Sequence, residues 1–170
     1  RPDAGFCTLS RCRPRKRPPT NPGMSRRKDK RMMGRALELA RLNHGLTGDN
    51  PSVGCVITDV MGRIVGAGVT AEGGRPHAEQ IALDDAGELA KGGTAYVTLE
   101  PCRERSTGED ACSRRLIDAG ITRVVCAISD IHPKGAGGFG VLRDAGIDVM
   151  VGLKRDDAKP LYEAFFASHS

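Results

Sequence analysis

Four side chains have the types and spacing needed to hold a metal ion and to move protons beside it. They are His77 and Glu79, two residues apart, together with Cys102 and Cys112. One imidazole and two thiolates give zinc three protein ligands, which leaves the fourth tetrahedral position for water. A carboxylate close to that position can take a proton from the water. The pattern therefore predicts a zinc-dependent hydrolase with His77, Cys102 and Cys112 as ligands and Glu79 as the proton carrier.

The predicted secondary structure places these residues at the ends of elements. Residues 94–99 form a β-rich run that leads into Cys102, while helical patterns begin at His77 and at Cys112. Active sites of open α/β sheets lie at the ends of strands, and a helix N-terminus favours a thiolate over a thiol. We therefore expect the three ligands on one rim of a sheet, in a state that can capture the metal.

The order of the remaining elements predicts the fold class. Helices are expected over residues 32–46, 77–89, 112–119, 141–145 and 156–167, and strands over residues 53–58, 63–69, 94–99, 123–128 and 147–151. The turn at residues 59–62 joins the first two strands as a hairpin, and each later strand follows a helix. This alternation predicts an α/β fold: a three-layer α/β/α sandwich around a mixed five-stranded sheet, antiparallel at the hairpin and parallel at the crossovers.

Basic residues are concentrated at one end of the chain. Residues 1–31 contain eleven Lys and Arg against two Asp, whereas residues 32–170 contain fifteen Lys and Arg against nineteen Asp and Glu. We therefore predict a disordered basic tail over residues 1–31 and a mildly acidic, zinc-dependent domain over residues 32–170. A domain that follows nucleic-acid backbones carries a basic face, so this composition favours a small-molecule substrate over a polynucleotide.

Three interpretations of the tail remain open. Its Pro- and Arg-rich stretch at residues 11–19 is compatible with an arm for nucleic acid or a membrane surface, and also with a targeting segment. The third interpretation, which we favour, takes Met24 as the natural start, so that the preceding residues do not belong to the mature protein.

The other cysteines and the lack of long apolar runs bear on the compartment. Cys55 and Cys126 lie in strand-like runs, where a buried free thiol is the ordinary expectation. A chain of this size and composition does not need disulfides to fold. No apolar run approaches the roughly 20 residues that cross a bilayer. We therefore expect a reducing, cytoplasmic environment and no membrane partner.

The ligand spacing departs from the short signature of zinc deaminases. In that signature H-x-E is followed by P-C-x-x-C. Here the first half matches, but Arg105 occupies the position of the second cysteine and Cys112 follows later. The combination still indicates deamination of a heterocyclic amine. It argues against the cytidine, tRNA-adenosine and polynucleotide deaminases that use the short spacing.

Five stretches resemble the deaminase domain of the riboflavin-biosynthesis bifunctional deaminase/reductase. They are residues 50–57, 76–79, 93–102, 117–125 and 144–149, and the resemblance extends over residues 32–166. That family also separates its two cysteines by a long loop. The resemblance implies a cytidine-deaminase-like fold, hydrolytic deamination of a phosphoribosylaminopyrimidine in flavin synthesis, and a homodimer or homotetramer. The reductase half is not part of the 170 residues, so the sequence is a stand-alone deaminase or one domain of a longer protein.

The resemblance also assigns roles to single residues. It implies the same zinc ligands and the same proton shuttle as the spacing does. Asn50 matches a substrate-contacting asparagine, and Asp130 matches the aspartate of an Asp-Pro-Asn-Pro loop.

Other positions depart from the family pattern. Thr70 stands where a histidine is common, and His132 replaces the asparagine of the Asp-Pro-Asn-Pro loop. The loop at residues 103–111 lacks the histidine and prolines of the family. The cations available to a phosphorylated substrate are Arg75, Arg103, Arg105 and Lys134. Because these positions contact substrate in the family, the zinc chemistry carries over more directly than the substrate does.

Three functions therefore remain. The first is a riboflavin-type pyrimidine deaminase, and the second is a deaminase of another nucleobase, nucleoside or modified pyrimidine. The third is a non-catalytic, zinc-stabilised domain that binds a partner. Glu79 argues against the third, because a structural zinc site has no need of it and would supply four ligands. The altered loop between the cysteines keeps the second function open.

Overall fold

The computed structural model of the protein describes residues 22–104, 110–132 and 135–168. Its helices are α1 (Pro22–Leu42), α2 (Ala78–Ala86), α3 (Cys112–Asp118), α4 (Gly138–Asp144) and α5 (Arg155–Ala167), with short 3₁₀ turns η1 (Glu72–Gly74) and η2 (Gly87–Ala90). Its strands are β1 (Gly54–Thr58), β2 (Ile64–Val69), β3 (Thr94–Leu99), β4 (Arg123–Ile128) and β5 (Asp148–Val151).

The five strands form one mixed sheet in the order β2-β1-β3-β4-β5. β1 pairs antiparallel with β2 and with β3, whereas β3–β4 and β4–β5 are parallel. The hairpin turn between β1 and β2 is held by Asp59, whose carboxylate accepts the backbone N–H groups of Met61 and Arg63, both at 2.9 Å. The predicted fold class and mixed sheet are confirmed.

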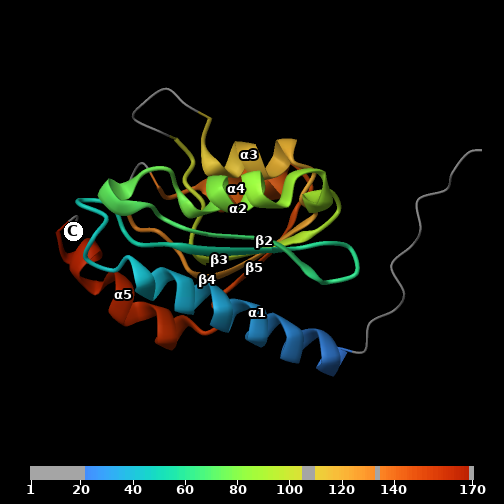
Figure 1. Cartoon of the computed structure of the whole chain (residues 1–170), viewed down its shortest axis with the longest axis horizontal. Coiled ribbons are helices and arrows are strands. Elements are labelled where there is room, and N and C mark those ends of the chain that lie inside the picture. Colours follow the sequence, from blue (N-terminus) through green and yellow to red (C-terminus); the bar gives the residue numbers. More distant parts are fainter. Residues whose placement is uncertain (1–21, 105–109, 133–134, 169–170) are drawn as a thin grey trace, which may run out of the picture.

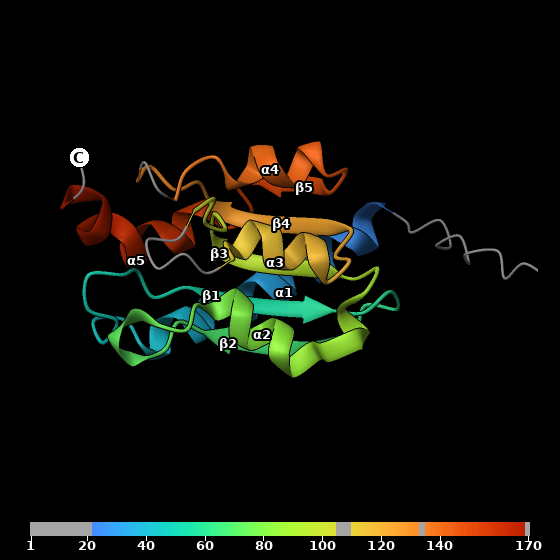
Figure 2. The same cartoon turned by 90° about the horizontal axis from the view of Figure 1, so that it is seen from above.

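Helices cover both faces of the sheet and give the predicted three layers. Figure 1 shows α1 and α5 on one face and α2, α3 and α4 on the other. Seen from above in Figure 2, α2 lies over β1 and β2, while α4 lies beside β5. The central strands β1 and β3 are buried along their whole length, as expected for strands covered on both faces. The edge strand β5 is mostly exposed.

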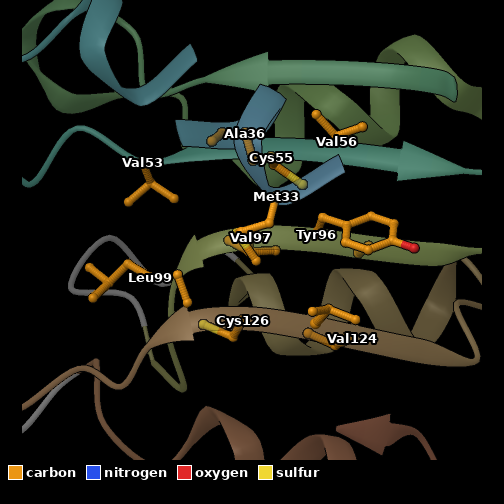
Figure 3. Packing of buried hydrophobic residues seen from close by; sticks show 14 of the residues in the cluster. Met33, Ala36, Val53, Cys55, Val56, Tyr96, Val97, Leu99, Val124 and Cys126 are labelled. Atoms are coloured by element: carbon orange, nitrogen blue, oxygen red, sulfur yellow. The ribbon is translucent and has the colours of Figure 1, made fainter. Parts of the chain in front are cut away.

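The core extends over both faces of the sheet, and part of it lies between α1 and the central strands. Figure 3 shows Met33 and Ala36 of α1 beside apolar side chains from β1 and β3. On the same side of the sheet, Tyr162 of α5 is fully buried and its hydroxyl contacts the Thr98 hydroxyl at 2.6 Å. The Tyr162 hydroxyl also donates to the backbone carbonyl of Ser52 at 3.1 Å. These contacts fix α5 against the segment that leads into β1.

The predicted boundary of the tail is wrong within the described residues. The first helix was expected to begin at residue 32, but α1 begins at Pro22 and ends at Leu42 instead of residue 46. Asp29, which composition assigned to the tail, is buried and accepts hydrogen bonds from the Tyr96 hydroxyl at 2.8 Å and from both terminal nitrogens of Arg123. Leu46, counted in the apolar stripe, is exposed. Residues 1–21 lie outside the described part of the chain.

Two other helices differ from their predicted bounds. α2 ends at Ala86 rather than residue 89, because Gly87 has a positive φ of 52° and the chain continues as the 3₁₀ turn η2. α4 begins at Gly138, before the predicted residue 141. Across the described residues, no helix has the length and apolar character required to traverse a membrane.

The buried Asp29–Arg123 pair predicts a stability effect that a disordered tail would not give. Asp29→Ala removes the buried carboxylate that pairs with the Arg123 guanidinium and accepts the Tyr96 hydroxyl, so the free energy of unfolding should fall by about 3 kcal/mol. Lys30→Ala, at an exposed position next to it, should change that value by less than about 0.5 kcal/mol. Urea titration of the three proteins measures both. Equal midpoints for all three would contradict the role of Asp29.

Candidate metal centre

The three predicted ligands come from three separate segments that meet at one end of the sheet. His77 precedes α2 as its N-cap residue, and Cys112 is the first residue of α3. Cys102 lies in the loop after β3. Its backbone carbonyl accepts hydrogen bonds from the N–H group and the hydroxyl of Ser113, at 3.3 and 3.0 Å. The loop that carries one cysteine is thus bonded directly to the helix that carries the other.

The position of α2 depends on a close approach to β2. A Cβ atom on Gly68 would lie 2.3 Å from the carbonyl oxygen of Ala78, and one on Gly66 would lie 2.1 Å from that of Ala82. Only glycine lets the helix backbone come this near to the strand. This contact sets the height of the first turn of α2 above the sheet, and therefore the position of His77 and Glu79.

The ligand atoms lie at distances suited to a metal ion. His77 Nδ1 is 3.4 Å from Cys112 Sγ and 3.9 Å from Cys102 Sγ. The three ligand atoms all lie within 4.8 Å of one another. A tetrahedral zinc with ordinary bond lengths separates a nitrogen and a sulfur ligand by about 3.5 Å. The donor set and its spacing therefore fit zinc, with three protein ligands in the described residues.

The local environment favours a thiolate at the site and disfavours thiolates elsewhere in the core. Hydrogen bonding from Cys112 and then from His77 lowers the pKa of Cys102 to about 4. The Cys112 backbone N–H at the start of α3 also points to this sulfur, at 3.4 Å. By contrast, burial raises the pKa of Cys55 and of Cys126. Both are free, buried thiols, as predicted.

Glu79 lies on the first turn of α2 and is 3% exposed. Burial is the main reason why its pKa is raised, and the negative charge on Cys102 adds to the effect. A buried carboxyl with increased proton affinity beside a cluster of metal ligands has the properties of a group that exchanges protons with a reacting molecule.

A cleft of about 470 Å³ opens over this cluster. Its lining includes His77, Glu79 and Cys102, and four residues predicted to contact substrate, namely Asn50, Thr70, Asp130 and His132. Arg75 also lines the cleft. Arg103, predicted to do so, lies outside the lining, and its guanidinium contacts Glu104 at 2.8 Å. Lys134 and Arg105 lie outside the described residues.

Some of the predicted substrate contacts have structural bonds of their own. The Thr70 hydroxyl accepts the backbone N–H of Val53 at 3.0 Å, so it joins the segments that flank β1 and β2. Asp130 Oδ1 accepts the backbone N–H of His132 at 2.8 Å, and the His132 ring lies 6.2 Å from the Phe165 ring. The loop and α5 therefore build one wall of the cleft together.

Several lining residues were missed by the sequence analysis. They are Asp49, Glu100, Glu104 and Phe165. Phe165 lies in the helix expected over residues 156–167 and was given no role from the sequence. The sequence does contain a signal for Glu100. This acidic residue directly follows a buried strand and lies two residues before a metal ligand, and a buried carboxylate needs hydrogen-bond partners.

A mixed α/β sandwich with a histidine and two cysteines beside the end of a central strand is the arrangement of zinc-dependent deaminases. The chain belongs to the cytidine and deoxycytidylate deaminase family, because residues 26–128 match the model of its zinc-binding region. The cofactor predicted from the ligand set, zinc, agrees with this family.

Related proteins extend the comparison. Riboflavin biosynthesis protein RibD of Haemophilus influenzae is 47% identical over 134 residues, which cover 78% of this chain and 36% of that protein. The diaminohydroxyphosphoribosylamino-pyrimidine deaminase of Buchnera aphidicola subsp. Schizaphis graminum is 41% identical, over 82% of this chain and 94% of the relative. The structure of Acinetobacter baumannii RibD superposes with a TM-score of 0.80 at 40% identity, over 86% of this chain and 41% of that one. The resemblance to the deaminase domain of the bifunctional enzyme is confirmed, and the chain spans less than half the length of these RibD proteins.

The ligand geometry predicts that metal content depends on each sulfur. Cys102→Ser and Cys112→Ser should each reduce bound zinc from about one equivalent per chain to well below half, because a hydroxyl replaces a thiolate in the site. Cys126→Ala removes a buried sulfur on β4 that lies outside the cluster, and it should keep its zinc. Elemental analysis of the purified proteins measures this. Full zinc in both serine variants would contradict the ligand assignment.

Proposed function

We propose that this chain catalyses the hydrolytic deamination of a diaminohydroxyphosphoribosylamino-pyrimidine. The observation that carries the proposal is the convergence of the His77, Cys102 and Cys112 ligand atoms beside a cleft whose lining includes His77, Cys102 and the buried Glu79. The Buchnera relative, of which the chain covers 94%, is named for this reaction. That relative supports the substrate more directly than the RibD proteins do, since the chain matches only part of their length.

The catalytic unit comprises the described elements from α1 to α5, with His77, Cys102 and Cys112 holding the metal. When bound, zinc supplies a Lewis acid that lowers the pKa of a water molecule toward about 7. Glu79 accepts one proton from water and gives it to the ring nitrogen. It then accepts the second proton, from the added hydroxyl group, and gives it to the amino group that leaves as ammonia. Its burial excludes bulk water from this transfer, and its increased proton affinity suits a group that both accepts and donates.

The substrate side of the cleft is assigned to its polar lining. Asn50 and Asp130 offer an amide and a carboxylate to the polar edge of a pyrimidine, and His132 offers a ring next to Phe165. Arg75 is the cation placed to meet a phosphate among the described lining residues. The Thr70 hydroxyl is bonded to Val53, so we assign Thr70 a role in shaping the cleft. A homodimer or homotetramer and a cytoplasmic location stay predictions.

One observation favours a second candidate, a deaminase of an unphosphorylated aminopyrimidine or purine. Glu104 is paired with Arg103, and in the described lining the carboxylates of Asp49 and Asp130 still outnumber the single Arg75 cation. Such a lining attracts a dianionic phosphate less than it attracts a neutral ring. A non-catalytic zinc domain accounts for neither the cleft nor the buried Glu79.

A substrate panel tests the proposal and separates the two candidates. Ammonia release is measured with the zinc-loaded protein on diaminohydroxyphosphoribosylamino-pyrimidine, on its dephosphorylated form, and on cytosine, cytidine and guanine. The proposed function requires the highest kcat/KM on the phosphorylated pyrimidine. A higher value on the dephosphorylated compound or on a free base would overturn it in favour of the second candidate. No ammonia from any compound would exclude both.

The role of Glu79 makes a separate prediction. Glu79→Gln keeps the size of the side chain but cannot carry a proton, so kcat should fall by at least about a hundredfold while zinc stays near one equivalent. Glu88→Gln, an identical change at an exposed position in η2, is the matched control and should keep full activity. Initial rates and elemental analysis on the same preparations measure both effects. Normal turnover in Glu79→Gln would remove it from the mechanism.

A further inference from the structure

Glu100 is a buried carboxylate that neither the metal cluster nor the proton transfer requires. It is 6% exposed and lies between the end of β3 and Cys102. Both of its oxygens accept backbone N–H groups: Oε2 from Asp130 at 3.1 Å, and Oε1 from Gly137 and Phe139, each at 3.0 Å. A single side chain therefore satisfies three backbone donors from a different part of the chain.

These three donors lie at two functionally distinct places. Asp130 follows β4 and lines the cleft, whereas Gly137 and Phe139 lie at the start of α4, which has no side-chain cap of its own. A carboxylate at a helix start satisfies N–H groups that have no partner within the helix. Glu100 thus caps α4 from another segment and ties it to the end of β4.

The backbone around Glu100 makes this connection rigid. The Glu100 N–H donates to the carbonyl of Ile128 at 3.0 Å, which extends the β3–β4 pairing by one step. A Cβ on Gly138 would lie 1.9 Å from the carbonyl oxygen of Pro101, so α4 begins in direct contact with the segment between Glu100 and Cys102. The segment at residues 100–102, which supplies a metal ligand, therefore supports the loop that contains Asp130.

We propose that Glu100 is a positioning residue for substrate binding: its carboxylate holds the Asp130–His132 segment and the start of α4 so that Asp130 and His132 face the cleft. This inference rests on the proposed function for the identity of the substrate. In this proposal Glu100 acts through the backbone N–H groups that its two oxygens accept. Its removal should change the affinity for substrate more than the metal content or the chemical step.

Glu100→Gln is the sharpest test. All three partners donate, so an amide must turn its NH₂ group toward at least one N–H group and lose that hydrogen bond. The KM should rise about tenfold, the size expected for one lost bond to a buried charge. We expect zinc to stay near one equivalent and kcat to stay within about threefold. Glu88→Gln serves as the matched control with unchanged constants.

A double mutant shows whether Glu100 acts through Asp130. Asp130→Asn alone should raise the KM, since it removes the charge proposed to meet the substrate and keeps an acceptor for the His132 N–H. If Glu100 only positions this segment, adding Glu100→Gln to Asp130→Asn should raise the KM less than it does in the wild-type background. Fully multiplicative effects would show that Glu100 acts independently of Asp130 and would overturn the inference.

Backbone amide exchange separates this inference from the proposed function. In Glu100→Gln the amides of Asp130, Gly137 and Phe139 should exchange faster, while those of the central β3 strand should not change. Faster exchange and a higher KM support the positioning role, whereas an unchanged KM in a folded, zinc-loaded variant overturns it. If Glu100→Gln does not fold, Glu100→Asp is tested by the same criteria. If the wild type releases no ammonia, the proposed function is wrong. The exchange rates then test by themselves whether Glu100 holds the Asp130–His132 segment and the start of α4.

Discussion

The site depends on a packing constraint that involves no functional side chain: α2 must lie almost in contact with the backbone of β2. Gly66 and Gly68 make this approach possible, and the first turn of α2 carries His77 and Glu79. The cysteines approach from the other side, on the loop after β3 and on the start of α3, which are joined through Ser113. A small shift of α2 would separate the imidazole from the two sulfurs, because the ligand atoms meet across only 3.4 and 3.9 Å. Metal binding is therefore a property of the helix–sheet packing as much as of the ligands.

Three buried carboxylates show how environment divides one chemical group among different tasks. Asp29 is neutralised by Arg123 and attaches α1 to the sheet. Burial raises the pKa of Glu79 beside the metal cluster, and this effect exceeds the opposite effect of His77. Glu100 is surrounded by backbone N–H groups, and it joins the loop of one ligand to the wall of the cleft. A buried carboxylate matched by a cation or by several N–H donors stabilises structure, whereas a buried carboxyl whose pKa is raised is suited to moving protons.

The family match and the expected departures from the family pattern concern different parts of the site. Membership of the cytidine and deoxycytidylate deaminase family agrees with the zinc-binding donor set. The departures from the family pattern concern the rim of the cleft instead: Thr70 is bonded to Val53, Arg103 to Glu104, and His132 lies next to Phe165.

The sequence by itself determined the fold class, all five strands to within a residue, and the set of candidate ligands. Alternating apolar runs and a short list of metal-binding residue types are local signals. It misplaced the start of α1, since the apolar stripe continues through a charged residue whose partner, Arg123, is 94 positions away. It gave no role to Glu100, whose three donors come from 30 to 39 residues later. Only the tertiary structure decided these contacts. It also decided that Arg75 lines the cleft and that Arg103 does not. A buried charge is stabilised by partners that the fold brings together, and no local pattern records which ones they are.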